Sequence, residues 1–230
     1  MLCFEQVKRK HAAMSIVAID VHPQRAFSEM CPDEVPVADA LSIVPHLNRQ
    51  ASWADFRVLT KDAHVPDAGW IVPQQPEHLP LEQAENWVSH AIVGTEGFET
   101  LPNLPNAVDY QFLVHIGLEQ GAHPFGACFH DMAENISTGL IEWLKQKEAK
   151  IILIGGLITE YCVQATVLQL CWYGPWRVIV NLEACRTLDG EQEQQAVLSM
   201  QQAGALVVAS TEEIEALLSD AQQQDYAFTI

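Results

Sequence analysis

The sequence predicts a single α/β domain in which helices cover both faces of a mostly parallel β-sheet. Three observations predict this fold: a length of 230 residues, a hydrophobic content of 49%, and short apolar runs that alternate with longer amphipathic segments. Near-continuous apolar runs are typical of strands that are buried on both faces. The expected architecture is therefore a three-layer α/β/α domain.

Six strands and five helices are expected along the chain. The strands are apolar runs at 15–20, 56–60, 110–116, 150–155, 176–181 and 205–210. The helical patterns lie between them, at about 37–51, 134–148, 159–173, 190–203 and 211–220. Segment 65–108 breaks the alternation, because it is rich in Pro, Gly and Trp and has no clear period. Loops of this length are usually functional, so we expect this irregular segment to line the active site.

The N-terminal end carries no recognisable targeting segment. Residues 1–13 are expected to form an extension and residues 14–230 the domain, because Met14 directly precedes the first apolar run. That run ends at Asp20 and is too short for the hydrophobic region of a signal peptide or for a membrane span. A cytoplasmic location is the expectation that follows.

The net charge bears on which partners the protein can bind, and the cysteine pattern bears on whether its thiols are reduced. Twelve Lys and Arg stand against 30 Asp and Glu, and the formal net charge of −18 repels phosphate backbones and anionic membrane surfaces. Nucleic acid and membrane partners are therefore not expected. The six cysteines form no CxxC pair and lie among apolar neighbours, which indicates reduced thiols rather than a disulfide framework.

Chemically competent side chains follow several of the predicted strands. In an open α/β sheet the ligand site lies outside the carboxyl ends of the strands. The first strand ends in Asp20, the second is followed by Asp62 and His64, and the fourth leads to Cys162. Each has a structural explanation when taken alone, since Asp20 could cap a turn and Cys162 could fill the core. Their convergence on one sheet edge favours a catalytic site.

The stretch "GGLITEYCVQAT" (155–166) places the cysteine at the start of a helix. If Thr159 is the N-cap, Cys162 is at position N3, where unpaired N–H groups and the helix dipole favour a thiolate. Asp20 could accept the thiol proton. The same N–H groups could hold the oxyanion that forms when a carbonyl is attacked.

A metal site is predicted beside the cysteine. Asp62 and His64 offer an oxygen and a nitrogen ligand from one turn, and His90 could supply a third ligand. Two histidines and one carboxylate would leave positions for water on a divalent zinc, iron or manganese ion. Spacing alone leaves other candidates open. They are His46, His78, His115, His123 and His130.

From about Ser15 to Ser210, the chain resembles the isochorismatase-like cysteine hydrolases, and most of all their nicotinamidase branch. The motifs that carry this resemblance are "VAID", "LTKDAH", "WVSHAIVGTEG", "GGLITEYCVQAT", "EACRT" and "MQQAGALVV". The resemblance implies the isochorismatase-like hydrolase fold and hydrolysis of a small amide.

The resemblance also implies roles for the residues around the cysteine. Cys162 would be the nucleophile, and Asp20 the base that takes its proton and later helps to expel ammonia. The N–H groups of Ile158 and Cys162 would form the oxyanion hole, after a cis peptide bond between Leu157 and Ile158.

A metal and an aromatic wall are implied as well. Asp62, His64 and His90 would hold the metal together with waters, and the metal could bind the ring nitrogen of a pyridine carboxamide. Trp87 would lie on the wall that binds the ring.

The sequence departs from the family pattern at the catalytic lysine. The family has this lysine just before a glycine at the end of the third strand, where this chain has Ile116 before Gly117. His115 is adjacent, but successive strand residues point to opposite faces. Lys61 is expected to point elsewhere. The loss of the amine should weaken activation of the thiol unless a neighbour compensates.

Other positions differ as well. The family's aromatic residue five positions after the first aspartate is matched by Arg25, although Phe27 fits after a small shift. An additional metal-binding histidine of some members is absent, because Ala68 or Trp70 occupies that region.

The function predicted is amide hydrolysis through a thioester, with nicotinamide or a related small amide as substrate. Two alternatives stay open: a non-enzymatic relative that binds a small molecule or a partner, and a hydrolase of another substrate on the same fold. A homo-oligomer is also expected, with the segment "CWYGPW" (171–176) as a candidate interface.

Overall fold

The computed structural model describes residues 15–74 and 80–227 of the chain, with side chains up to residue 219. The predicted extension, residues 1–13, lies outside the described residues. Among the described residues, no helix is long and apolar enough to cross a membrane.

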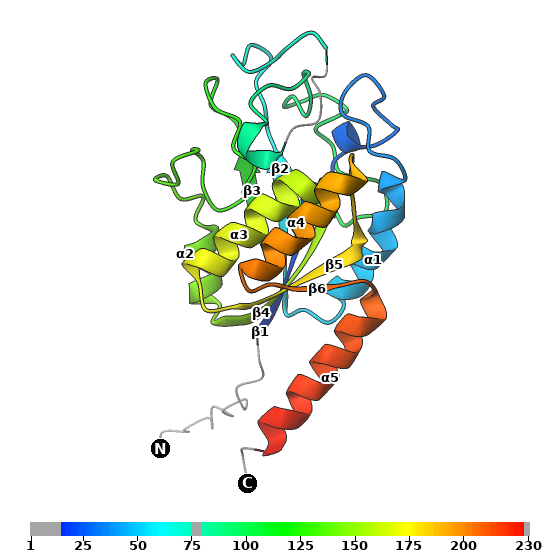
Figure 1. Ribbon diagram of the computed structural model, residues 1–230, viewed down its shortest axis with the longest axis vertical. Coiled ribbons are helices and arrows are strands. Elements are labelled where there is room, and N and C mark those ends of the chain that lie inside the picture. The colour runs from blue at the N-terminus through cyan, green and yellow to red at the C-terminus, as the bar shows by residue number, and fades with distance from the viewer. Residues whose placement is uncertain (1–14, 75–79, 228–230) are drawn as a thin grey trace, which may run out of the picture.

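A six-stranded parallel sheet forms the centre of the domain (Figure 1). Its strands lie in the order β3-β2-β1-β4-β5-β6. Their bounds are β1 Ser15–Val21, β2 Phe56–Asp62, β3 Phe112–Ile116, β4 Ala149–Leu157, β5 Arg177–Arg186 and β6 Leu206–Val208. All six strands were predicted from the apolar runs, and the strands observed there confirm the fold class.

Five α-helices accompany the sheet in the part of the chain that the structure describes. They are α1 Ile43–Ala51, α2 Leu140–Gln146, α3 Gln164–Tyr173, α4 Gly190–Gln202 and α5 Thr211–Ala227. Three of them, α1, α2 and α3, begin later than the sequence pattern predicts, and a π-helical turn, Thr159–Val163, stands at the predicted start of α3. Before α1 the chain turns through Asp39 at φ 59° into a 3₁₀ turn, and Gly139 at φ 86° precedes α2, so left-handed backbone delays both helices.

The helices cover both faces of the sheet, as predicted (Figure 1). On one face, which also carries α3 and α4, the α2 residue Trp143 packs its ring 5.7 Å from Phe56 and 5.1 Å from Phe112, measured between ring centroids. On the other face, Ile16 and Ala18 of β1 pack in one cluster with Ile214 of α5. That second face is shared with α1, whose Asn48 accepts a hydrogen bond from Arg57.

Strand register decides which side chains share a face. Paired residues of neighbouring parallel strands point the same way, and successive residues alternate. Val21 pairs with Thr60 and Asp62 pairs with Ile116, so these side chains lie on the face of α2 and α3. Asp20 is one residue before Val21 and therefore points to the face of α1 and α5.

The irregular segment lies over the carboxyl ends of the strands. Within its described residues, 65–74 and 80–108, it contains no β-strand or α-helix, only 3₁₀ turns at Leu81–Gln83 and Ala107–Asp109. Single β-bridges fix its course, including one between His64 and Ile92 and one between Ile71 and Trp87. Its Trp70, Trp87 and His90 are buried.

Candidate active site

Cys162 lies in a π-helical turn between β4 and α3. This turn, Thr159–Val163, begins after Ile158, which is the N-cap. The predicted cap at Thr159 is therefore wrong, and its hydroxyl donates instead to the carbonyl of Arg186 at 2.9 Å. Cys162 remains in the first turn, and only 3% of its surface is exposed.

The surroundings of the thiol keep it protonated at rest. Burial, together with the nearby carboxylate of Asp62, raises the pKa of the Cys162 thiol well above its usual value. The N–H groups of Ile158 and Cys162 itself act in the opposite direction, because both donate toward the sulfur. The peptide bond between Leu157 and Ile158 is cis, as the resemblance implied. Attack by this sulfur therefore requires a base that removes the proton.

His22 is the basic side chain that the structure brings to the thiol. It follows β1 with φ 42°, and this turn of the backbone directs the chain away from the strand. One ligand atom each from His22, Asp62 and Cys162 lies within 4.8 Å of the others. The Nδ1 atom of His22 is 3.4 Å from Oδ1 of Asp62, slightly long for a hydrogen bond. All three side chains are buried.

The carboxylate of Asp62 stays ionised beside these rings. Burial acts to raise its pKa, but His22 and His64 together hold the pKa of Asp62 well below its usual range. A charged carboxylate can orient the His22 ring and stabilise it when it takes a proton.

Asp20 is not beside the thiol, and the prediction that it is the base is corrected. Its Oδ2 accepts hydrogen bonds from Arg57 Nε and from the Tyr110 hydroxyl, both at 2.8 Å. Register places this group on the sheet face opposite to Asp62. Burial raises the pKa of Asp20, and the Arg57 guanidinium lowers it. Asp20 thus belongs to a buried ion pair beneath α1 rather than to the chemistry at Cys162.

No lysine among the described residues takes up the position of the missing amine. Ile116 is fully buried in the core, paired with Asp62. Lys61 points to the opposite face, where its Nζ lies 3.4 Å from the centroid of the Phe98 ring. His22 is consequently the neighbour that can compensate for the lost activation.

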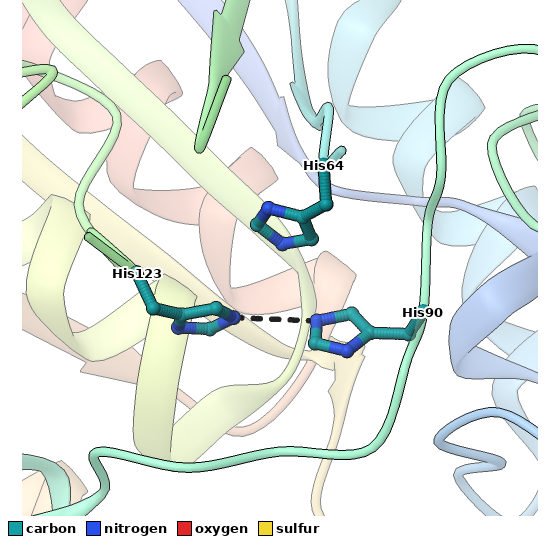
Figure 2. A group of neighbouring side chains, drawn as sticks. All are labelled: His64, His90 and His123. Atoms are coloured by element: carbon teal, nitrogen blue, oxygen red, sulfur yellow. Dashed lines mark hydrogen bonds between the residues drawn. The ribbon is translucent and has the colours of Figure 1, made fainter. Parts of the chain in front are cut away.

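Three histidine rings converge beside Asp62 (Figure 2). They belong to His64 after β2, His90 of the irregular segment and His123 after β3, and one ligand atom from each lies within 4.8 Å of the others. Asp62 adjoins this group, with its Oδ2 3.8 Å from Nε2 of His64. The structure thus brings together the predicted set Asp62, His64 and His90 and adds His123.

The rings are in the form that binds metals. Burial, followed by the influence of His64, lowers the pKa of His90 to about 4 and that of His123 well below its usual value. Neutral imidazoles offer a lone pair. Among the described residues, Nε2 of His64 and both carboxylate oxygens of Asp62 are buried without a hydrogen-bond partner. Such orphaned polar atoms fit a divalent cation.

Aromatic side chains enclose the same space. Trp87, the predicted ring-binding residue, lies 4.8 Å from the ring of Tyr161 and 6.2 Å from that of Phe125, measured between centroids. It stacks on His123 with an interplanar angle of 13°. Flat apolar surface beside a thiol and a candidate metal suits a small aromatic molecule.

Sequence reasoning missed His22 and left His123 among several candidates. A signal for His22 was present, because Phe27 lies five residues after position 22 and not after position 20. The family's aromatic spacing therefore aligns its aspartate with His22. His123 follows β3, as His64 follows β2, but its spacing to the other site residues is not informative.

The fold and site together define a class of α/β protein with a buried cysteine at the start of the helix after the fourth strand, flanked by imidazoles. The sequence profile of the Isochorismatase domain family matches residues 15–213, and the chain belongs to that family.

The relatives include several nicotinamidases. The chain is 27% identical to the nicotinamidase of Escherichia coli strain K12 over 186 residues, which cover 74% of this chain and 84% of that protein. A solved structure of an Acinetobacter baumanii nicotinamidase pyrazinamidease superposes with a TM-score of 0.74 at 25% identity, covering 90% of this chain and all of the other. The pyrazinamidase of Pyrococcus horikoshii, solved in complex with zinc, shares the fold at a TM-score of 0.67 and 24% identity, over 84% of this chain and 98% of that one.

Proposed function

We propose that this protein hydrolyses a small carboxamide to a carboxylic acid and ammonia through a thioester on Cys162. The observation that carries the proposal is the setting of the thiol, which lies beside His22 and Asp62 at a helix start whose N–H groups face it. The nicotinamidase relatives and the aromatic wall make a pyridine carboxamide the first substrate to test.

His22 is the proposed base and acid. Nδ1 of His22 faces Asp62, and Nε2 of His22 has no hydrogen-bond partner among the described residues, so Nε2 can take a proton. As the Cys162 sulfur bonds to the amide carbon, the thiol proton passes to His22 and the carbonyl π electrons move onto oxygen. Asp62 stabilises the resulting imidazolium, in the role that a carboxylate has in nucleophile–His–Asp triads.

The tetrahedral intermediate then collapses. Its oxyanion accepts hydrogen bonds from the N–H groups of Ile158 and Cys162, the proposed oxyanion hole. The carbon–nitrogen bond breaks as His22 returns its proton to the leaving nitrogen, which departs as ammonia. Water next attacks the thioester carbon, giving a proton to His22. The carbon–sulfur bond breaks, that proton returns to sulfur, and the acid is released.

A divalent cation has a place beside this thiol. The proposed ligands are Asp62, His64 and His90, and their donor types suit zinc, iron or manganese. When bound, such an ion would supply a coordination position for the ring nitrogen of a pyridine carboxamide. Trp87 would hold the ring by stacking, which orients the carboxamide toward Cys162.

The test is ammonia release by the purified protein loaded with zinc, iron or manganese. The expected result is release from nicotinamide or another amide in a panel of small carboxamides, abolished in Cys162→Ala. The control is Cys171→Ala, because Cys171 is a half-buried thiol at the far end of α3. If no amide in the panel yields ammonia with any of the three metals, the proposal fails and the non-enzymatic alternative replaces it.

A homo-oligomer remains part of the proposal. Trp172 and Tyr173, in the segment 171–176, are 64% and 41% exposed. Exposed aromatic residues of this kind are enriched at protein interfaces. Sedimentation of the wild type and of Trp172→Ser tests whether the segment is a subunit contact.

A further inference from the structure

The three histidines come from three separate parts of the chain and point into one space (Figure 2). His64, His90 and His123 are 0%, 2% and 7% exposed. Burying three polar rings together costs free energy unless their nitrogen atoms find partners. These nitrogen atoms therefore need hydrogen-bond partners or a bound cation.

Backbone contacts fix the outer nitrogen of two rings. Nδ1 of His64 is 3.1 Å from the carbonyl oxygen of Gly117, and Nδ1 of His90 is 2.7 Å from that of Val88. A carbonyl oxygen only accepts, so each Nδ1 carries the proton and each Nε2 presents a lone pair. A carbonyl behind a ring is also the usual orienting partner of a metal-binding histidine.

The inner nitrogens face one another. Nε2 of His123 is 3.3 Å from Nε2 of His90, the contact drawn in Figure 2. A single Nε2–H on His123 could serve the lone pair of His90 but would leave that of His64 unmatched. Among the described residues, Nε2 of His64 has no hydrogen-bond partner, nor does Nδ1 of His123. A proton therefore satisfies this group less completely than a cation would.

The observed spacing suits a shared ion. Two nitrogens bound tetrahedrally at ~2.0–2.1 Å from zinc lie about 3.4 Å apart. The separation between His90 and His123 is already close to this value. The ligand atom of His64 lies within 4.8 Å of those of His90 and His123, so reaching the zinc spacing takes a shift of at most about 1.4 Å.

Packing holds the third ring in place. His123 lies between two tryptophans, with ring centroids 4.4 Å from Trp70 and 6.0 Å from Trp87. On the other side of the group, Gly117 has φ 79°, and a Cβ atom at that position would collide with the His64 ring. The rings are thus preorganised by their surroundings.

From this geometry we infer that His123 is a further metal ligand, so that three imidazoles, those of His64, His90 and His123, bind the divalent cation of this protein alongside the proposed ligand Asp62. Three neutral nitrogens favour zinc, iron and similar ions over magnesium and calcium, which prefer oxygen. The inference refines the metal site of the proposed hydrolase, but it requires no turnover and can be tested apart from catalysis.

The experiment measures zinc affinity by competition with a chromophoric chelator, starting from metal-free protein. His123→Gln removes the imidazole with little loss of volume, and His115→Gln is the matched control, because His115 is exposed on the opposite sheet face. We expect one zinc per chain in the wild type and the control, and at least ~10²-fold weaker binding in His123→Gln. Excess magnesium should not compete.

A spectroscopic readout accompanies the affinity. Cobalt(II) bound to wild type should show visible absorption that changes in His123→Gln and not in His115→Gln. Circular dichroism of the metal-free variants checks that each is folded, and His123→Asn replaces His123→Gln if that variant is not. Zinc affinity and cobalt spectra in a folded His123 variant that match the wild type would overturn the inference, whether or not the protein hydrolyses amides.

Discussion

Replacing His22 or Asp20 should separate catalysis from stability. The proposed base is His22, which lies beside Cys162, whereas Asp20 lies with Arg57 on the opposite face of the sheet. His22→Gln removes the proton carrier and should lower kcat/KM by about 10²–10⁴-fold, because this is the usual contribution of a positioned acid–base group. That loss equals ~3–5 kcal/mol of transition-state stabilisation.

Asp20→Asn should act on the fold instead. The Asp20 side chain is fully buried and Arg57 is 13% exposed, with Nη2 2.7 Å from Oδ2. Removing one charge of a buried pair leaves the other uncompensated and typically costs ~3–5 kcal/mol. Asparagine keeps the acceptor for Tyr110, so the expected loss is at the lower end of this range. The folded fraction should keep its kcat within about threefold.

The assay combines urea unfolding with ammonia release, and rates are corrected for the folded fraction. His22→Gln should lose activity and keep most of its stability, and Asp20→Asn should do the reverse. The reasoning is refuted if Asp20→Asn abolishes turnover in a fully folded protein while His22→Gln remains active, since Asp20 would then be the base.

Three other results are expected. In metal-free protein, burial lowers the pKa of His90 to about 4, against about 6.5 when unfolded. The unfolded chain takes up the proton first, so the contribution of His90 to stability is full above pH ~6.5 and falls by up to ~3 kcal/mol toward pH 4. Urea titrations at each pH should show a smaller fall in His90→Gln than in the wild type, because the lowered pKa of His123 remains in that variant. Gly117→Ala should displace the His64 ring and weaken zinc binding at least tenfold, whereas Gly121→Ala, with open space around its added Cβ, should not. Trp87→Phe should raise KM for a pyridine carboxamide several-fold with a smaller change in kcat, because it shrinks the stacking surface; an unchanged KM would remove Trp87 from the wall.

The fold was predictable because its signals are local. Six apolar runs marked the six strands, and alternation with helices implied parallel pairing. Helix starts were less predictable, since left-handed residues such as Asp39 at φ 59° leave no strong trace in an amphipathic pattern. The motifs around Cys162 and His90 are also formed by residues that are adjacent in the sequence, so the place of the candidate site could be predicted from them.

The identity of the base could not be read from strand ends alone. Asp20 and His22 are two residues apart, and in a regular strand both would point to one face. The strand ends at Val21, and His22 adopts φ 42°, so its side chain leaves that alternation and reaches Asp62. Only the spacing to Phe27 hinted at this. The proposed role of His123 could not be predicted, because its contact with His90 joins residues that are 33 positions apart in the sequence and meet only in the folded chain.

The central claim, a thioester on Cys162 formed with the help of His22, is tested most directly by trapping the intermediate. Metal-loaded protein is mixed with nicotinamide, quenched in acid within milliseconds to seconds, and analysed by intact-protein and peptide mass spectrometry. The account predicts a nicotinoyl adduct on the peptide that contains Cys162, absent in Cys162→Ala and slower to form in His22→Gln. Ammonia release by Cys162→Ala at the wild-type rate, with no adduct on any cysteine, would contradict it.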